Sequence, residues 1–172
     1  PLPAMPDTVS GFRRKGRHMT LTRRSLLAVA LMIPVAGTIL RPALAREPEI
    51  YAPGGVALQG YDPVAYFTTG KPVKGSPDHA LMWRGATWYF ASAESQEAFE
   101  MNPQAYAPQY GGYCAYAMTK GAISPTAPEA FAVAGGRLYL TYSTEVRAIW
   151  EEDIDGNVAL ADLHWPEVMN KK

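Results

Sequence analysis

The chain has 172 residues, and its 16 basic and 16 acidic residues give a formal net charge of zero. The balance is uneven: residues 1–45 hold seven of the basic residues and one of the acidic ones, which leaves residues 46–172 with nine and 15, a net charge of −6. An acidic segment without clustered Lys and Arg argues against nucleic acid as a partner, because phosphate binding needs such clusters. Residues 46–172 suffice for one domain with a core of its own.

The first element in the chain is an export signal. The pair Arg23-Arg24 directly precedes an uncharged and mostly apolar run, Leu26–Leu40. This run is shorter than the roughly 20 residues of a membrane-spanning helix. The segment Ala43-Leu44-Ala45 is typical of the small residues before a signal-peptidase site. We therefore expect residues 1–45 to be a cleaved signal peptide, with no stable membrane anchor afterwards.

The arginine pair resembles a twin-arginine signal, which would carry the protein across the membrane already folded. A general-secretion signal is the alternative, since Leu26 stands where Phe is commoner and no Lys follows. Met19 is a candidate for the natural start. Either route predicts a periplasmic location for the domain at 46–172.

Short helices alternate with short strands after the leader, which predicts a small single α+β domain with antiparallel hairpins. Helix starts are indicated by Asp62-Pro63, Ser92 and Ser143, and a helix end by Gly156. The expected hairpins pair 80–83 with 87–90 and 130–133 with 138–142. The expected helices are 64–67, one to about 101, a short one after Cys114, one to about 154, and 158–163 ending near Trp165-Pro166.

Several motifs carry a resemblance to a known family. They are Tyr61-Asp62-Pro63-Val64, Tyr89-Phe90-Ala91-Ser92, and the spaced Phe99, Pro103 and Tyr106. These resemble the YHS domain. The segments Gln109–Ala115, Leu138-Tyr139, Ala161-Asp162 and Trp165-Pro166 resemble an exported bacterial subfamily of it. The resemblance implies an association with transition metals, often copper.

The chain departs from the metal-associated members of that family at three positions. Where those members carry cysteines, this sequence has Ala65, Ala91 and Ser95. Alanine has no donor atom, and a serine hydroxyl is a poor ligand for a soft metal. A metal could therefore not be bound here in the same way.

Cys114 is the only cysteine, and the predicted compartment is oxidising. Three interpretations stay open: a buried inert side chain, a soft metal ligand, or a reactive or partner-linked thiol. As a ligand it would have Met118 on the same face of a helix, and a thiolate with a thioether suits Cu(I). A third ligand would come from elsewhere; His79 is the first candidate, followed by Met82, Met101 and His164.

The tyrosines Tyr106, Tyr110, Tyr113 and Tyr116 form a second cluster. They predict either a core whose hydroxyl groups reach backbone partners or the wall of a pocket for an apolar or aromatic ligand.

No motif of a hydrolase or of a nucleotide-binding enzyme is present. We therefore expect a periplasmic, non-catalytic binding module, with copper or another transition metal as its ligand and Cys114, Met118 and His79 as the metal site. The alternative is a structural or protein-interaction domain that has lost the metal site of the family, with an unidentified protein as partner.

Overall fold

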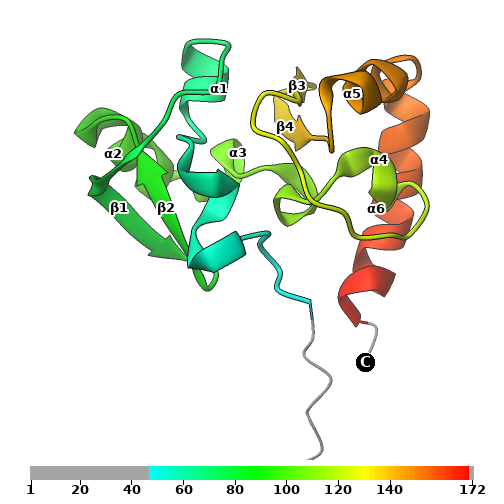
Figure 1. Cartoon of the computed structure of the whole chain (residues 1–172), viewed down its shortest axis with the longest axis horizontal. Helices are drawn as coiled ribbons and strands as arrows, with labels where there is room; N and C mark the ends of the chain where they lie inside the picture. Colours follow the sequence, from blue (N-terminus) through cyan, green and yellow to red (C-terminus); the bar gives the residue numbers. More distant parts are fainter. Residues whose placement is uncertain (1–46, 171–172) are drawn as a thin grey trace, which may run out of the picture. The chain divides into compact units, whose positions relative to one another are not determined.

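The computed structural model describes residues 47–170 of the chain, so the predicted signal peptide lies outside the described residues. They form a small α+β domain with two antiparallel two-stranded sheets, as the sequence predicted (Figure 1). The strands are β1 (Ser76–Trp83), β2 (Ala86–Phe90), β3 (Phe131–Ala134) and β4 (Arg137–Leu140). The α-helices are α1 (Ala65–Thr68), α2 (Ala93–Met101), α3 (Pro103–Tyr106), α4 (Ala115–Met118), α5 (Thr144–Glu151) and α6 (Ile154–Asn170), and the 3-10 helices are η1 (Pro53–Gly55), η2 (Ala57–Gly60) and η3 (Gln109–Gly112).

The first hairpin, β1–β2, buries alternate residues of its second strand. Ala86, Trp88 and Phe90 are buried, whereas the residues between them are partly exposed, which is the pattern of a strand with one face on a core. Phe99 of α2 packs against this face, with its ring centroid 5.1 Å from that of Trp88. The resulting aromatic cluster of Trp88, Phe90 and Phe99 belongs to the first hydrophobic core.

The second hairpin, β3–β4, joins two cores, because both faces of β4 are buried. Leu138 and Leu140 point into the first core, and Tyr139 points into a second core that contains Met118 and Trp150. Side chains alternate across a strand, so one three-residue segment contributes to both cores. The hairpin turns through Gly135 and Gly136, both at positive φ.

Serine caps start two of the helices as the sequence predicted. The Ser92 hydroxyl accepts a hydrogen bond from the Ser95 backbone N–H (3.2 Å), and the Ser143 hydroxyl accepts one from Val146 (3.3 Å). Each bond satisfies a backbone donor that the first helical turn leaves without a partner.

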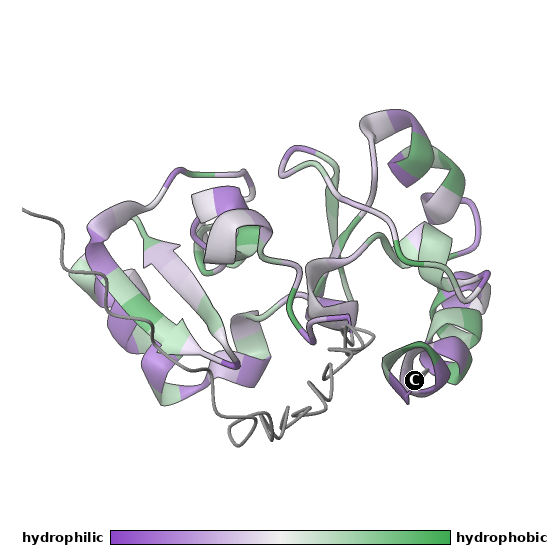
Figure 2. Cartoon of the chain, turned by 60° about the horizontal axis from the view of Figure 1, so that its bottom comes forward, coloured by the Kyte–Doolittle hydropathy of each residue, from purple (hydrophilic) through white to green (hydrophobic). Residues whose placement is uncertain are grey.

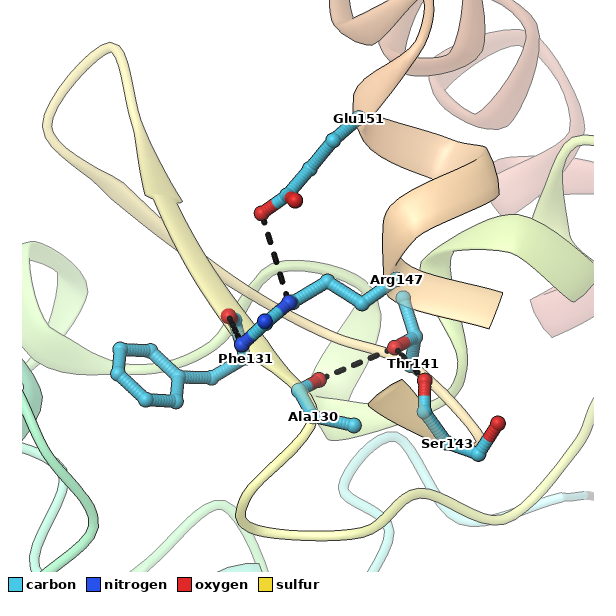
Figure 3. A network of polar contacts seen from close by, with 6 residues as sticks. All are labelled: Ala130, Phe131, Thr141, Ser143, Arg147 and Glu151. Carbon is cyan, nitrogen blue, oxygen red and sulfur yellow. Dashed lines mark hydrogen bonds and ion pairs between the residues drawn. The ribbon is translucent and has the colours of Figure 1, made fainter. Parts of the chain in front are cut away.

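An arginine holds α5 against the second hairpin (Figure 3). The Arg147 guanidinium donates to the carbonyl oxygen of Phe131 in β3 (3.3 Å) and forms an ion pair with Glu151 (3.6 Å). The Thr141 hydroxyl, at the end of β4, donates to the carbonyl oxygens of Ala130 and Ser143. These contacts tie the start of α5 to the strands that precede it.

The last helix differs from the prediction. Gly156 was expected to end a helix, and Trp165-Pro166 to end the next one, but α6 runs through both. Asp153 explains the start of α6: its carboxylate accepts a hydrogen bond from the Gly156 N–H (3.0 Å), which places Gly156 in the first turn. A Cβ at position 156 would overlap that carboxylate, so a larger residue there would displace the exposed Asp153 side chain from this hydrogen bond.

Hydrophobic and hydrophilic residues alternate along α6 (Figure 2). Its buried residues, Ala161 and Val168, pack in the second core, whereas Leu160 and Leu163 are exposed. No helix within residues 47–170 combines the length and the apolar character that a membrane crossing requires.

Candidate functional site

A buried carboxylate joins the two segments that resemble the YHS motifs. Asp62 is fully buried, and its Oδ1 accepts hydrogen bonds from the backbone N–H groups of Val64 (2.8 Å) and Ala65 (3.4 Å). Its Oδ2 accepts one from the backbone N–H of Ala91 (3.0 Å). Asp62 therefore ties the start of α1 to the end of β2, and we call this group the Asp62 junction.

The junction brings together two of the three positions at which the resemblance would place cysteines. The backbone N–H groups of Ala65 and Ala91 both donate hydrogen bonds to the Asp62 carboxylate. Neither alanine side chain has an atom that could coordinate a metal. Ser95, the third position, lies in the first turn of α2. The residues present do not fit a soft metal at this place, because all of the expected thiols are absent.

Cys114 and Met118 lie at the two ends of the single turn of α4, and Cys114 itself has an extended rather than a helical backbone (φ −60°, ψ 113°). Cys114 is 2% exposed and directly precedes α4, and Met118, at the end of that helix, is fully buried. The Met118 N–H donates to the Cys114 carbonyl oxygen (3.0 Å), which places the two sulfur side chains one helical turn apart. The Cys114 N–H in turn donates to the Ser124 carbonyl oxygen (3.1 Å).

The other candidate ligands lie on several different elements. His79 is in β1, in electrostatic contact with Glu94 of α2, and Met82 and Met101 are 67% and 81% exposed. His164 of α6 lies over Gly121, whose N–H donates to the Met118 carbonyl oxygen. Between residues 47 and 170, no group of three or more His, Cys, Asp or Glu side chains is arranged to hold a metal ion.

The structure contains a cleft that the sequence did not indicate. Its volume is about 410 Å³. We call it the hairpin-tip cleft, because the tips of both hairpins contribute an arginine to it. It is lined by Glu49, Ile50, Trp83, Arg84, Gln104, Ala107, Pro108, Gln109, Tyr110, Gly111, Arg137 and Trp165.

One wall of the cleft depends on a close backbone contact. The Tyr51 N–H donates to the Gly111 carbonyl oxygen (2.8 Å), so the chain around residues 49–51 crosses directly over η3. A Cβ at Gly111, which has φ +61°, would overlap the carbonyl oxygen of Glu49. Glycine at this position therefore permits the crossing that forms the wall.

Arg84 occupies an unusual backbone position at the tip of the first hairpin. Its φ is +48°, in a two-residue turn with Gly85 where Asn, Asp or Gly is the usual choice. Its guanidinium lies over the ring of Trp83 (4.7 Å to the centroid) and forms an ion pair with Glu49. The unusual turn residue is the one signal by which the sequence could have indicated this site.

Tyr110, from the predicted tyrosine cluster, forms part of the cleft lining from η3, also at positive φ (+52°). Its hydroxyl donates to the Asp162 carboxylate (2.9 Å), and Trp165 packs against its ring at 6.0 Å. Burial raises the pKa of Tyr110 well above its usual range, and the contact with Asp162 raises that pKa further. The hydroxyl is therefore a neutral donor at physiological pH, and it is already engaged by Asp162.

No family model, no curated protein and no solved structure matches this chain. The relationship to the YHS domain therefore rests on the residues of this sequence and stays a prediction.

Proposed function

We propose that the chain is an exported, non-catalytic binding module of the YHS type, and that it binds a small ligand in the hairpin-tip cleft. Its export follows from the leader at residues 1–45 and its family from the motifs around Asp62. The cleft supplies a ligand site that does not depend on the absent cysteines.

The observation that supports this proposal is the construction of the cleft. Four residues other than glycine between positions 47 and 170 have a positive φ, and two of them, Arg84 and Tyr110, line the cleft. Such strained residues concentrate at binding sites. A volume of about 410 Å³ lies within the range of about 300–1,000 Å³ that is typical of small-molecule sites. Three aromatic side chains, Trp83, Tyr110 and Trp165, lie among the mostly polar groups of the lining, and aromatic side chains are common in such sites.

A panel of four indole compounds tests the proposal. Indole, indole-3-acetamide, tryptamine and indole-3-acetate share one flat ring and differ in the charge and hydrogen-bonding groups they carry. We expect at least one of them to raise the melting temperature of the mature domain, because a ligand that binds the native state stabilises it by mass action.

A cleft-filling variant shows whether such a shift comes from this site. Gln104 is exposed on α3 and lines the cleft, so Gln104→Trp should fill it and abolish the shift. Ala105 is exposed on the same helix but does not line the cleft, so Ala105→Trp is the matched control and should keep the shift. If none of the four compounds produces a shift, or if Gln104→Trp leaves the shift unchanged, the cleft is not the ligand site.

A second candidate function is copper binding, and the proximity of Cys114 to Met118 favours it. A thiolate and a thioether one turn apart are suitable donors for Cu(I). The site would be buried. Of the two histidines, His164 is the better candidate, because it lies over Gly121, three residues after Met118, on a helix that packs against α4.

Metal analysis tests the copper proposal. Under reducing conditions we expect one Cu(I) per wild-type chain and none in Cys114→Ala. His164→Ala and His79→Ala should separate the two candidates for the third ligand. Copper uptake that persists in Cys114→Ala would contradict this assignment. If neither copper nor the indole panel binds, the domain is a structural or protein-interaction module.

A further inference from the structure

We infer that the ligand of the hairpin-tip cleft is a small organic monoanion whose carboxylate binds Arg137. This inference rests on the proposed function of the cleft and adds the chemical class of its ligand.

Arg137 differs from the other arginines in its partners. Of the three arginines between residues 47 and 170, Arg84 pairs with Glu49 and Arg147 pairs with Glu151, whereas Arg137 forms no ion pair with a described carboxylate. It follows the Gly135-Gly136 turn directly, at the start of β4, and its side chain is in electrostatic contact with Tyr110 and Tyr139. The cleft is therefore lined by a guanidinium group that is available to an anion.

The charges of the cleft favour a monoanion. Its charged lining residues, Glu49, Arg84 and Arg137, sum to +1, within a segment whose net charge is −6. Glu49 already neutralises Arg84, which leaves Arg137 as the one guanidinium of the lining without an ion pair, and one guanidinium balances one negative charge of a ligand. The planar fork of a guanidinium matches the two oxygens of a single carboxylate.

The aromatic lining favours a ligand that also has a flat apolar part. Trp165 of α6 is partly exposed; it makes an edge contact with Tyr110 (6.0 Å between ring centroids) and a tilted contact with Tyr113 (6.3 Å), so the tyrosines hold its ring in place. Trp83, on the first hairpin, has one face covered by Arg84. A fixed indole beside a guanidinium suits an aromatic or similarly flat carboxylate.

Calorimetric titration with indole-3-acetate and its neutral isostere indole-3-acetamide tests the inference. We expect the acetate to bind and the amide to bind about tenfold more weakly or not at all, because a charge-assisted hydrogen bond is lost. Arg137→Gln should weaken acetate binding by about the same factor and leave the amide unchanged. Lys71→Gln, which removes an exposed cation outside the cleft lining, is the control and should leave both affinities unchanged.

The outcomes separate this inference from the proposed function. If indole or tryptamine raises the melting temperature in a manner that Gln104→Trp abolishes, but indole-3-acetate does not bind, the cleft is a ligand site of another chemical class and the inference is wrong. Equal affinity for the acetate and the amide, or acetate binding that survives Arg137→Gln, overturns it as well. If no compound binds the wild-type cleft, the inference and the proposed function both fail.

Discussion

The Asp62 junction and the hairpin-tip cleft each join segments that are far apart in the sequence, and each contains charged side chains. The two differ in what those charged side chains bind. At the junction, a fully buried carboxylate accepts hydrogen bonds from three backbone N–H groups. In the cleft, the partners of the charged groups are side chains: Arg84 pairs with Glu49 while both stay about half exposed, and Arg137 forms no ion pair with a described carboxylate. The motif residues around Asp62 thus serve the fold, whereas the two arginines of the cleft, Arg84 and Arg137, lie outside the motifs.

The sulfur pair adds a third environment to this comparison. Cys114 and Met118 are about as buried as Asp62, but Met118 packs in the second core, which also contains Trp150, rather than in a hydrogen-bonded junction. The indole N–H of Trp150 is buried without a hydrogen-bond partner among the described residues. The second core therefore already contains a polar group without a partner.

The largest effect is expected at the junction. Asp62→Ala leaves the buried backbone N–H groups of Val64 and Ala65 and the partly buried N–H of Ala91 without their acceptor, and we expect the free energy of unfolding to fall by about 3 kcal/mol. Urea denaturation of the mature domain measures the change. Asp78→Ala is the matched control, since Asp78 is exposed and its side chain contacts only Ser76.

A stability of Asp62→Ala within 0.5 kcal/mol of Asp78→Ala, a margin of about the size of ordinary surface effects, would mean that the junction does not hold the fold. In that case, the contrast between a structural motif and a ligand cleft would be lost.

A smaller effect is expected where backbone forms the cleft wall. Gly111→Ala introduces a Cβ into the Glu49 carbonyl oxygen, and we expect it to cost about 2 kcal/mol more than Gly135→Ala. Gly135 is the control, because its φ of +57° is close to the +61° of Gly111 but a Cβ built there would have no atom within 4 Å. The difference in unfolding free energy therefore isolates the crossing of residues 49–51, and equal losses in the two variants would exclude a role for that contact.

The sequence predicted local structure well wherever one side chain determines it. Ser92 and Ser143 mark helix starts because a hydroxyl caps the first turn, and the two hairpins follow from alternating burial around short turns. Gly156 misled the prediction, because its role depends on the Asp153 carboxylate three residues earlier. A single glycine fits a helix start and a helix end equally well.

The candidate site was less accessible to sequence reasoning. The sequence predicted one shared helix face for Cys114 and Met118, but Cys114 precedes α4 with an extended backbone, so the helical spacing does not apply to it. The cleft joins positions 49, 84, 110, 137 and 165, and no local periodicity relates them. The contact between Gly111 and the chain near Glu49 determines where its wall lies, and that contact is a property of the folded backbone.

The smallest effect at neutral pH is expected at Tyr66, which packs beside the junction in α1. Its hydroxyl donates to the carbonyl oxygen of Pro128 (3.2 Å), so Tyr66→Phe should cost about 1 kcal/mol at pH 7. Burial, with smaller contributions from Glu129, Tyr61 and Asp62, raises the pKa of Tyr66 in the folded state well above its ordinary value near 10.

The sign of the pH dependence follows from this shift. A folded-state pKa above the unfolded value gives stability that is complete below pH 10 and is lost as the pH rises above 10, because the unfolded chain releases the proton first. Tyr66→Phe should therefore reduce the alkaline loss by up to about 1.4 kcal/mol per pH unit. Denaturation at several pH values between 9 and 11.5, a range set around the ordinary tyrosine pKa of about 10, measures the slope. Tyr142→Phe, at an exposed tyrosine, is the control, and equal slopes in the two variants would show that the Tyr66 proton does not stabilise the fold.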